Sequence, residues 1–345
     1  MTPFLYIKTS FVTDLVTAKK KTMFDNIDLG LLQNDVLTTD FLSETINYFD
    51  VTGEHNFNGE YVISGRLNDS FKISVSKRKI SIKDASLCKW YLGNNFETLQ
   101  RKDVQHAIEK LSDTLHLPID KAKVTRFDVA QNFIMKYPVQ VYYNHLGEMA
   151  YCKRVPVING SNGMEGLYYY KNNKSGLAVF YNKIKEQKSK RQPIPELFQN
   201  RNVLRYEQRH KNNLSKTFNV EYVTASMLYD EMFYKNVIDK WGANYKAIKK
   251  ILNRNILNFK DMDITTKKEL HDIALLAYIN NSGGELAMIE QINEMQKMGK
   301  LTRKQAFDFR KEIKEACKLT IGTEIENETI YELNKKVNDA IKHYR

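Results

Sequence analysis

The spacing of apolar residues changes once along this chain of 345 residues, near residue 218. Before that point, short stretches alternate apolar and polar residues, as at Phe71, Ile73 and Val75, which is the period of a β-strand with one buried face. After it, apolar residues recur at helical spacing from Leu228 to Leu252. The sequence therefore predicts an α+β domain over residues 1–218 and an all-helical domain over residues 219–345.

Within the first region, the pattern predicts one helix and several strands. The helix begins near Asp103 and ends at the Leu117–Pro118 break. The strands that carry polar side chains are Val124–Phe133, Leu167–Lys171, Leu177–Lys183 and Val203–His210. We expect the middle two to form a hairpin through the turn at residues 172–176.

In the second region, Ser282-Gly283-Gly284 separates two predicted helices, Gly299 ends the second, and Thr302 with Gln305 forms a capping box that opens a third. Five large apolar residues are expected to fill the core of this region: Trp241, Met288, Met295, Phe307 and Phe309. Five basic residues are expected to leave a basic surface that either holds duplex DNA or only keeps the protein soluble: Lys249, Lys250, Lys300, Arg303 and Lys304.

Composition favours a nucleic-acid partner and a reducing compartment. Lys and Arg outnumber Asp and Glu by 53 to 41, which gives a net charge of +12 and a pI of about 9.3. The three cysteines, Cys88, Cys152 and Cys317, show no C-x-x-C spacing, so neither a zinc knuckle nor a disulfide framework is expected. No secretory signal and no apolar run of about 20 residues is present, so we expect a soluble cytoplasmic protein without a membrane partner.

Two of the predicted strands carry alternating acidic and basic residues. Period two places Arg126 and Asp128 on one face of the first strand, and Arg205, Glu207 and Arg209 on one face of the last. If these strands are neighbours, Asp128 and Glu207 share a divalent cation, Mg²⁺ or Mn²⁺, while the arginines hold a phosphate. The alternative is that these residues form cross-strand salt bridges and nothing more.

The segment between those strands supplies a candidate nucleophile. The alternation places Tyr181 and Lys183 side by side at the end of their strand, where the ammonium group would stabilise a phenolate that attacks phosphorus. Tyr168, Tyr169 and Tyr170 compete for this role. Basic residues crowd the segment, and its tyrosines are able to stack on unpaired bases, so single-stranded or melted DNA is the expected ligand.

Five motifs occur in a familiar order: Ser86-Leu87-Cys88-Lys89-x-x-x-Gly93-Asn94-Asn95, Arg126-Phe127-Asp128-Val129-Ala130, Tyr168–Tyr170, Phe180-Tyr181-Asn182-Lys183-x-x-Glu186 and Leu204-Arg205-Tyr206-Glu207-x-Arg209. Together, over roughly residues 5–215, they resemble the phage/plasmid replication initiation proteins of the gene II/X family. That family is related to the filamentous-phage gene II endonuclease and, more distantly, to the Rep-trans plasmid initiators.

The resemblance implies an antiparallel replication-initiator-type sheet flanked by helices, and a rolling-circle initiator with endonuclease and strand-transferase activity. Such an enzyme nicks one origin strand, stays joined to the 5′ phosphate through a tyrosine, and later rejoins the strand; host helicase and polymerase are the implied partners. By motif alignment, Tyr181 corresponds to the family's tyrosine before a lysine, Asp128 and Glu207 to its acidic positions, and Arg126, Arg205 and Lys183 to its basic positions. From the strand patterns and the resemblance together, we expect Tyr181, Lys183 and Arg205 to act in catalysis and Asp128 and Glu207 to bind the metal. The residues expected to bind DNA are Lys89, Arg126, Tyr169, Lys171, Lys174, Lys185 and Arg209.

The sequence departs from many rolling-circle enzymes because its seven histidines include no His-hydrophobic-His pair. A carboxylate metal site is then required, and we expect His210 to be structural and His106 to lie on the surface. Two other functions remain open: a mobilisation relaxase with the same chemistry, and a non-catalytic origin- or operator-binding protein.

Overall fold

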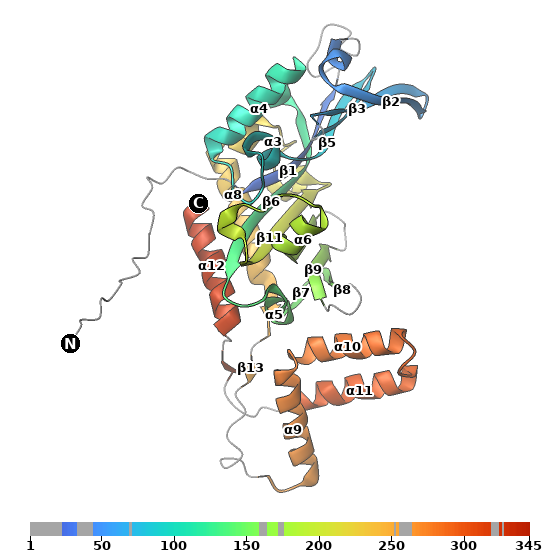
Figure 1. Cartoon of the computed structure of the whole chain (residues 1–345), viewed down its shortest axis with the longest axis vertical. Helices are drawn as coiled ribbons and strands as arrows, with labels where there is room; N and C mark the ends of the chain where they lie inside the picture. Colours follow the sequence, from blue (N-terminus) through green and yellow to red (C-terminus); the bar gives the residue numbers. More distant parts are fainter. Residues whose placement is uncertain are drawn as a thin grey trace, which may run out of the picture.

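The computed structural model describes residues 23–32, 44–68, 71–158, 164–171, 176–251, 253–254, 264–318, 324–325 and 328–345. Its centre is a ten-stranded sheet in which every neighbouring pair of strands is antiparallel (Figure 1). In spatial order the strands are β2 (Asp50–Phe57), β3 (Glu60–Leu67), β4 (Phe71–Ser76), β5 (Lys79–Ser86), β1 (Phe24–Leu32), β6 (Lys123–Met135), β11 (Asn202–Lys211), β10 (Gly176–Asn182), β9 (Met164–Lys171) and β8 (Cys152–Ile158).

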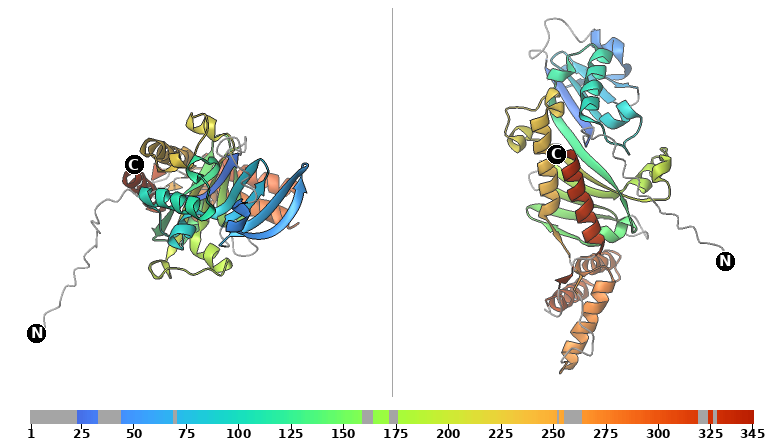
Figure 2. Two further views of the ribbon diagram at one scale, coloured as in Figure 1. Left: turned by 90° about the horizontal axis from the view of Figure 1, so that it is seen from above. Right: turned by 90° about the vertical axis from the view of Figure 1, so that its left-hand side faces the viewer.

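Within the described residues, seven helices accompany this sheet: α3 (Leu87–Leu92), α4 (Arg101–Leu115), α5 (Val139–Asn144), α6 (Lys183–Ser189), α7 (Leu214–Phe218), α8 (Glu231–Ala247) and α12 (Glu328–Tyr344). Helices α8 and α12 contact each other and cover one face of the sheet (Figure 2). Helix α6 contacts β10 and β11 on the opposite face (Figure 1). The two faces of β11 therefore meet different surroundings, one apolar and one polar.

The predicted α+β fold is confirmed, and most of its elements lie where the periodicity placed them. Strand β6 contains the predicted Val124–Phe133 and β11 contains Val203–His210. Helix α4 begins at a capping box of Gln100 and Asp103. The predicted turn at residues 172–176 lies outside the described residues except for Gly176.

The apolar face of the central strands forms the main core with the helices. Tyr206 of β11 stacks on Phe180 of β10, with ring centroids 4.5 Å apart, and it also contacts Trp241 and Tyr245 of α8. Residues of α4, α8 and α12 belong to the same buried cluster as the strands. Helices on both sides of residue 218 thus stabilise one sheet by burying apolar surface against it.

Between α8 and α12 lies a separate unit of three helices, α9 (Lys267–Asn281), α10 (Glu285–Lys297) and α11 (Arg303–Ala316). Its own core contains Ile279, Ile292, Ala306, Ile313 and Ala316. The glycines at 283 and 284 separate α9 from α10, and Thr302 with Gln305 forms the predicted capping box of α11. The region beyond residue 218 also contributes short strands: β12 (Ile248–Lys250) pairs with β7 (Leu146–Met149), and β13 (Asn253–Arg254) pairs with β14 (Glu324–Ile325).

The expectation that the large apolar residues of this region fill a core is wrong for three of them. Trp241 is fully buried and Met288 packs against the small core. Phe307 and Phe309 are 60% and 43% exposed, and Met295 is also exposed. The reason is that α11 turns Ala306, Ile313 and Ala316 towards α9 and α10, so residues on its other faces meet solvent.

The described chain contains no helix that is both long and apolar enough to cross a bilayer.

His210, on the apolar face of β11, is structural, as predicted. Its ring lies 4.9 Å from that of Phe127 and 5.2 Å from that of Phe218, and its Nε2 atom has no hydrogen-bond partner within the described part of the chain. Burial, assisted by Lys171 and Lys240, lowers the pKa of His210 to about 3.

This burial predicts an acid-sensitive fold. Below pH 6.5 His210 binds a proton in the unfolded chain, whereas in the folded chain it stays neutral down to about pH 3. The free energy of unfolding therefore decreases as the pH is lowered through this window. We expect the acid-induced decrease in the free energy of unfolding to be smaller by on the order of 3 kcal/mol in His210→Phe. Urea titrations from pH 7 to pH 3.5 measure the free energy of unfolding, and His106→Gln is the surface control. Equal pH dependence in the wild type and His210→Phe would contradict the prediction.

Candidate functional site

The polar face of the sheet lies where β6 and β11 pair. Arg209 is directly opposite Asp128 and Arg205 is directly opposite Asn132. The two strands are therefore neighbours, as the metal-site hypothesis required. Arg126 and Asp128 share a face, and so do Arg205, Glu207 and Arg209, because side chains within each set contact one another.

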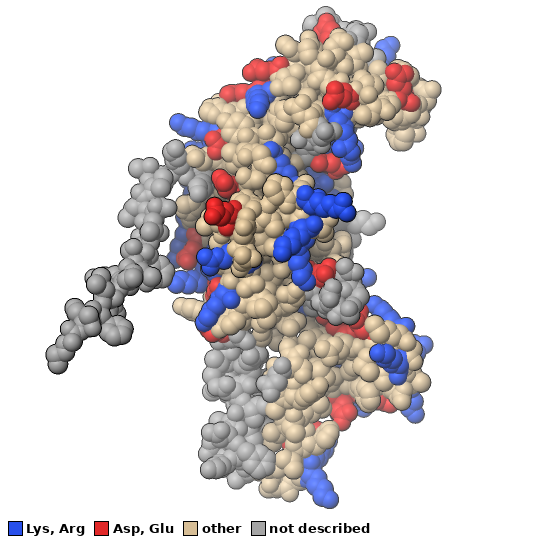
Figure 3. Space-filling view, viewed as in Figure 1, with Lys and Arg blue, Asp and Glu red and all other residues tan. Residues whose placement is uncertain are grey.

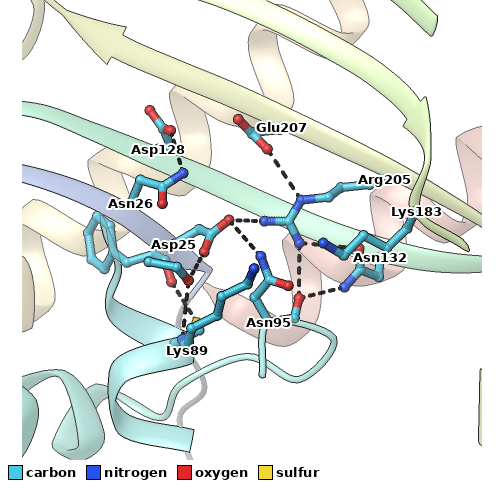
Figure 4. A network of polar contacts seen from close by, with 12 residues as sticks. Asp25, Asn26, Lys89, Asn95, Asp128, Asn132, Lys183, Arg205 and Glu207 are labelled. Atoms are coloured by element: carbon cyan, nitrogen blue, oxygen red, sulfur yellow. Dashed lines mark hydrogen bonds and ion pairs between the residues drawn. The ribbon is translucent and has the colours of Figure 1, made fainter. Parts of the chain in front are cut away.

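The guanidinium of Arg205 is the centre of the polar network (Figure 4). Only 2% of this side chain is exposed, and it forms ion pairs with Asp25 of β1 and, at 3.3 Å from Nε, with Glu207. Its Nη1 atom donates to the backbone oxygen of Asn95 at 3.1 Å and to Oδ1 of Asn132 at 3.2 Å. A buried cation is stable only when its charge and its donors are satisfied in this way.

The carboxylate of Asp128 is held by a second arginine. Arg126 donates to it through Nε at 3.0 Å and Nη2 at 2.6 Å, and Asn26 donates through Nδ2 at 3.0 Å. The Nε atom of Arg209 lies 2.6 Å from Oε1 of Glu207 and 4.0 Å from Oδ2 of Asp128. The cation of Arg209 therefore occupies the space between the two carboxylates.

Burial and charge act in opposite directions on these acids. Burial raises the pKa of Asp128, and the negative charge of Glu207 adds to this rise, although Arg126 opposes it. Burial also penalises ionised Glu207, but Arg205 and Arg209 outweigh that effect and lower the pKa of Glu207 well below its usual range. Of the two carboxyl groups, Glu207 is therefore the one that resists protonation more strongly as the pH falls.

Tyr181 lies beside this network at the edge of a cavity of about 560 Å³. Its hydroxyl donates to Oε2 of Glu207 at 3.2 Å. Burial raises the pKa of Tyr181 well above 10, against the opposing effect of Arg205, so the phenol is neutral at rest. The cavity is lined by four cations, Lys185, Lys188, Lys190 and Arg209, and by Tyr168 and Glu186 among others.

The prediction that Lys183 stands beside Tyr181 on a strand is wrong. Strand β10 ends at Asn182, whose side chain accepts a hydrogen bond from the backbone N–H of Lys185 and caps α6. Lys183 is the first residue of that helix and is fully buried. Its Nζ atom lies 2.8 Å from Oε2 of Glu186 and 5.5 Å from the ring centre of Phe96, and burial lowers its pKa to about 8. Lys183 thus fixes α6 and does not line the cavity.

The proposed DNA-binding residues have different surroundings. Arg209 and Lys185 line the cavity, and Lys185 lies 3.8 Å from Glu165. The Nζ atom of Lys89 donates to Gln192 at 2.7 Å. Lys171 is partly exposed at the end of β9, whereas Lys174 lies outside the described residues.

Tyr169 does not fit the DNA-binding role that the sequence suggested. It is 1% exposed, and its hydroxyl donates to the backbone oxygens of Leu146 and Gly147 at 3.1 and 2.7 Å. The neighbouring Tyr168 has the opposite orientation, because it pairs across the sheet with Val179 on the side where Tyr181 and Glu207 lie. Tyr168 is therefore the tyrosine of this triplet that faces the cavity.

Sequence reasoning missed Asp25 and Asn95. Asp25 accepts from Arg205, from the hydroxyl of Ser86 and, at 3.4 Å, from the side chain of Asn95. The sequence contains Asn95 at the end of the first motif, whereas the burial of Asp25 is visible only in the structure. Neither position stands out without knowing that Arg205 is buried.

Asp128 and Glu207 supply the hard oxygen donors that Mg²⁺ and Mn²⁺ prefer. In the present arrangement, Arg209 stands between them, and no group of three or more His, Cys, Asp or Glu side chains within the described ranges is placed to hold a metal ion. The donor chemistry fits a divalent cation once Arg209 moves away. The side chain of Arg209 is 34% exposed and lines the cavity, so a ligand in the cavity is able to reach it.

One protein-family model agrees with the motif series. The family model for the N-terminal region of the gene II type of replication-associated protein matches residues 23–228, more than half of the chain, and confirms the resemblance. A solved rolling circle replication initiator protein from Geobacillus stearothermophilus overlaps with a TM-score of 0.35 and 11% identity, over 73% of this chain and 96% of that one. A comparison with curated proteins gave no match.

The Arg205 network predicts a large stability loss when its cation is removed. Arg205→Met leaves Asp25 and Glu207 as buried carboxylates without their shared cation, so we expect the free energy of unfolding to fall by about 3–5 kcal/mol. Urea denaturation at pH 7 measures this. Arg78→Met, which removes an exposed arginine 3.0 Å from Glu60, is the matched control and should change stability by less than about 0.5 kcal/mol. Equal losses in the two variants would contradict the central role of Arg205.

Proposed function

Because the chain belongs to the gene II family of replication-associated proteins, we propose that it initiates rolling-circle replication by nicking one strand at an origin. The observation that supports this most directly is the hydrogen bond from the hydroxyl of Tyr181 to Glu207 at the edge of a cavity lined by cations. A phenol that lines a cavity with cations in its wall and is hydrogen-bonded to a carboxylate has the parts needed for nucleophilic attack on a phosphodiester.

In the proposed reaction, Oη of Tyr181 attacks the phosphorus atom of the scissile phosphodiester. The oxygen–phosphorus bond forms, the bond between phosphorus and the 3′ oxygen breaks, and the phenolic proton passes through Glu207 to the departing 3′ oxygen. Because the pKa of Glu207 is low and that of Tyr181 is high, this proton moves only as the new bond forms. The product is a 5′-phosphotyrosine, and attack by a 3′ hydroxyl on that linkage reverses the step and rejoins the strand.

The arginines have two roles in this proposal. Arg205 holds Glu207 ionised and in place, since both are buried and the Nε of Arg205 lies 3.3 Å from the carboxylate. Arg209 leaves Glu207 to bind the scissile phosphate, whose charge it partly neutralises. Lys185 and the other cavity cations hold the flanking phosphates of single-stranded or melted origin DNA.

We propose Asp128 and Glu207 as the ligands of Mg²⁺ or Mn²⁺ after Arg209 has moved. When bound, the ion would polarise the phosphodiester and neutralise charge that develops on its oxygens. Arg126 keeps Asp128 in position throughout, through its two hydrogen bonds to that carboxylate. Host helicase and polymerase are the proposed partners in replication, and the cytoplasm is the proposed compartment.

One observation favours a second candidate function. Every arginine of the site is engaged with a carboxylate, as in a purely structural network. A non-catalytic origin-binding protein would need nothing more. A mobilisation relaxase would use the same chemistry on a transfer origin and differs from an initiator only in its substrate. The covalent adduct separates either enzyme from the binder.

The first prediction of this proposed mechanism is that Tyr181→Phe abolishes covalent attachment while leaving DNA binding largely intact, since only the nucleophilic oxygen is removed. Single-stranded origin DNA labelled at its 3′ end is incubated with protein and Mg²⁺, and the adduct is read on a denaturing gel. Tyr170→Phe, on the exposed end of β9, is the matched control and should attach normally. Retained attachment by Tyr181→Phe, with loss in Tyr168→Phe, would move the nucleophile to Tyr168.

The second prediction concerns competition between Arg209 and the metal. Arg209→Gln removes the cation that lies between Asp128 and Glu207, so Mn²⁺ should bind about tenfold more tightly without DNA, which is about 1.4 kcal/mol. Electron paramagnetic resonance of free Mn²⁺ measures this. Lys211→Gln, two residues along β11, is the charge-matched control and should leave the affinity unchanged. Unchanged affinity in Arg209→Gln, or full binding by Asp128→Asn, would refute the proposed ligand set.

A further inference from the structure

Helix α11 exposes a basic face that has no role in the nicking site. Four cations on it are exposed, Arg303, Lys304, Lys311 and Lys314, and the exposed ring of Phe307 lies among them. We call these five residues the α11 basic face. Lys300 and Lys318, which are also exposed, flank the helix at its two ends. The family match ends at residue 228, so this face lies outside the matched region.

Helical periodicity arranges the face as two rows of cations with an aromatic ring between them. Lys304 and Lys311 are seven residues apart and share one side of the helix, while Arg303 and Lys314 lie on the other side of Phe307. The acidic residues of α11 lie beyond the Lys304 row. Lys311 lies 3.9 Å from Glu315, and both side chains are more than half exposed, so this pair contributes little. Arg303, Lys304 and Lys314 form no ion pair with the described residues.

We propose that the α11 basic face binds duplex DNA, with the helix in the major groove. The helix has 14 residues and a length of about 21 Å, and the major groove, about 12 Å wide, admits an α-helix. The two rows of cations match the phosphate backbones on either side of the groove, and Phe307 points to its floor, where a thymine methyl group offers an apolar contact.

The helical unit is attached to the strand that borders the cavity. Arg154 of β8 forms an ion pair with Glu290 of α10, and both side chains are largely buried. The Nε atom of Arg154 also donates to the backbone oxygen of Leu146 at 2.9 Å. Val157 of the same strand lines the cavity that contains Tyr181. In Figure 3, basic side chains gather at the free end of α10 and α11, away from the sheet.

The inference rests on the proposed function for its choice of DNA as the polyanion, and it assigns duplex and single-stranded DNA to different surfaces. The cavity at Tyr181 takes the unpaired strand that is cut, while α11 holds neighbouring duplex. Binding of duplex DNA by the α11 basic face is mainly electrostatic. Each lysine–phosphate contact should therefore contribute about 0.9 to the magnitude of the slope of log K against log salt concentration.

The experiment measures binding of a fluorescein-labelled duplex of mixed sequence, about 30 base pairs long, by fluorescence anisotropy from about 50 to 300 mM salt. The full-length double variant Lys304→Gln/Lys311→Gln should bind more than about tenfold more weakly at about 0.15 M salt, with a salt slope reduced by about two. Glutamine preserves helix propensity, and circular dichroism checks the fold. Phe307→Ser should weaken binding without changing the slope, because an apolar contact releases no counterions.

The control is Lys267→Gln/Lys268→Gln, which removes the same charge from exposed positions on α9. Equal losses in the two double variants, or an unchanged salt slope in the α11 variant, would overturn the proposal. Adduct formation on a single-stranded oligonucleotide, measured in parallel, should be unaffected by the α11 changes. Failure of the wild type to form any adduct would refute the nicking function. The proposal for α11 would still be tested by the affinities and salt slopes of the duplex-binding experiment.

Discussion

The buried guanidinium of Arg205 is the interaction on which the candidate site depends. It links Asp25 on β1, Asn132 on β6, Glu207 on β11 and the backbone of Asn95 between α3 and α4. An unpaired charge in this position would cost several kcal/mol, so the chain gains by bringing all four segments together. The polar side of the sheet is consequently assembled by folding itself, before any ligand binds.

The order of the charges across the sheet separates a rigid part of the site from an adjustable part. Arg205 and Lys183 are sealed in the interior, each beside a carboxylate. Arg209 and Tyr181 stand at the boundary with the cavity, and both contact Glu207. A negatively charged ligand in the cavity competes with Glu207 for Arg209, whereas it cannot reach Arg205. The proposed chemistry therefore uses the contacts of Arg209 and Tyr181, which a ligand in the cavity is able to displace. The buried contacts of Arg205 hold the geometry of the site.

Periodicity in the sequence was sufficient to find β6, β9, β10 and β11 and to place Glu207 on the same face as its arginines. It did not reveal Asp25, because β1 is irregular: its register shifts between Phe24 and Ile27 against β6, so simple alternation does not hold there. It misplaced Lys183 because the cap formed by Asn182 starts a helix where alternation predicted a strand. Strict alternation places Tyr169 and Tyr168 on opposite faces of β9. Tyr169 was wrongly assigned to DNA binding because the three tyrosines were treated as equivalent. Which strands are neighbours and which ion pairs form are long-range properties that the local pattern does not contain.

The end of the chain is coupled to the sheet, although nearly all of the recognisable motifs precede residue 218. Helix α12 returns to the first core, and the hydroxyl of its Tyr344 lies 2.9 Å from Oε1 of Gln131 on β6 and 3.1 Å from the hydroxyl of Thr98. Thr98 and Asn95 belong to the same segment between α3 and α4, so α12 braces the segment that also binds Arg205. The α9–α11 unit is thus an insertion between two helices, α8 and α12, that the sheet needs. Such an insertion is able to acquire a duplex-binding surface while the core around Arg205 stays unchanged, because the insertion has a small core of its own that is separate from the core of the sheet.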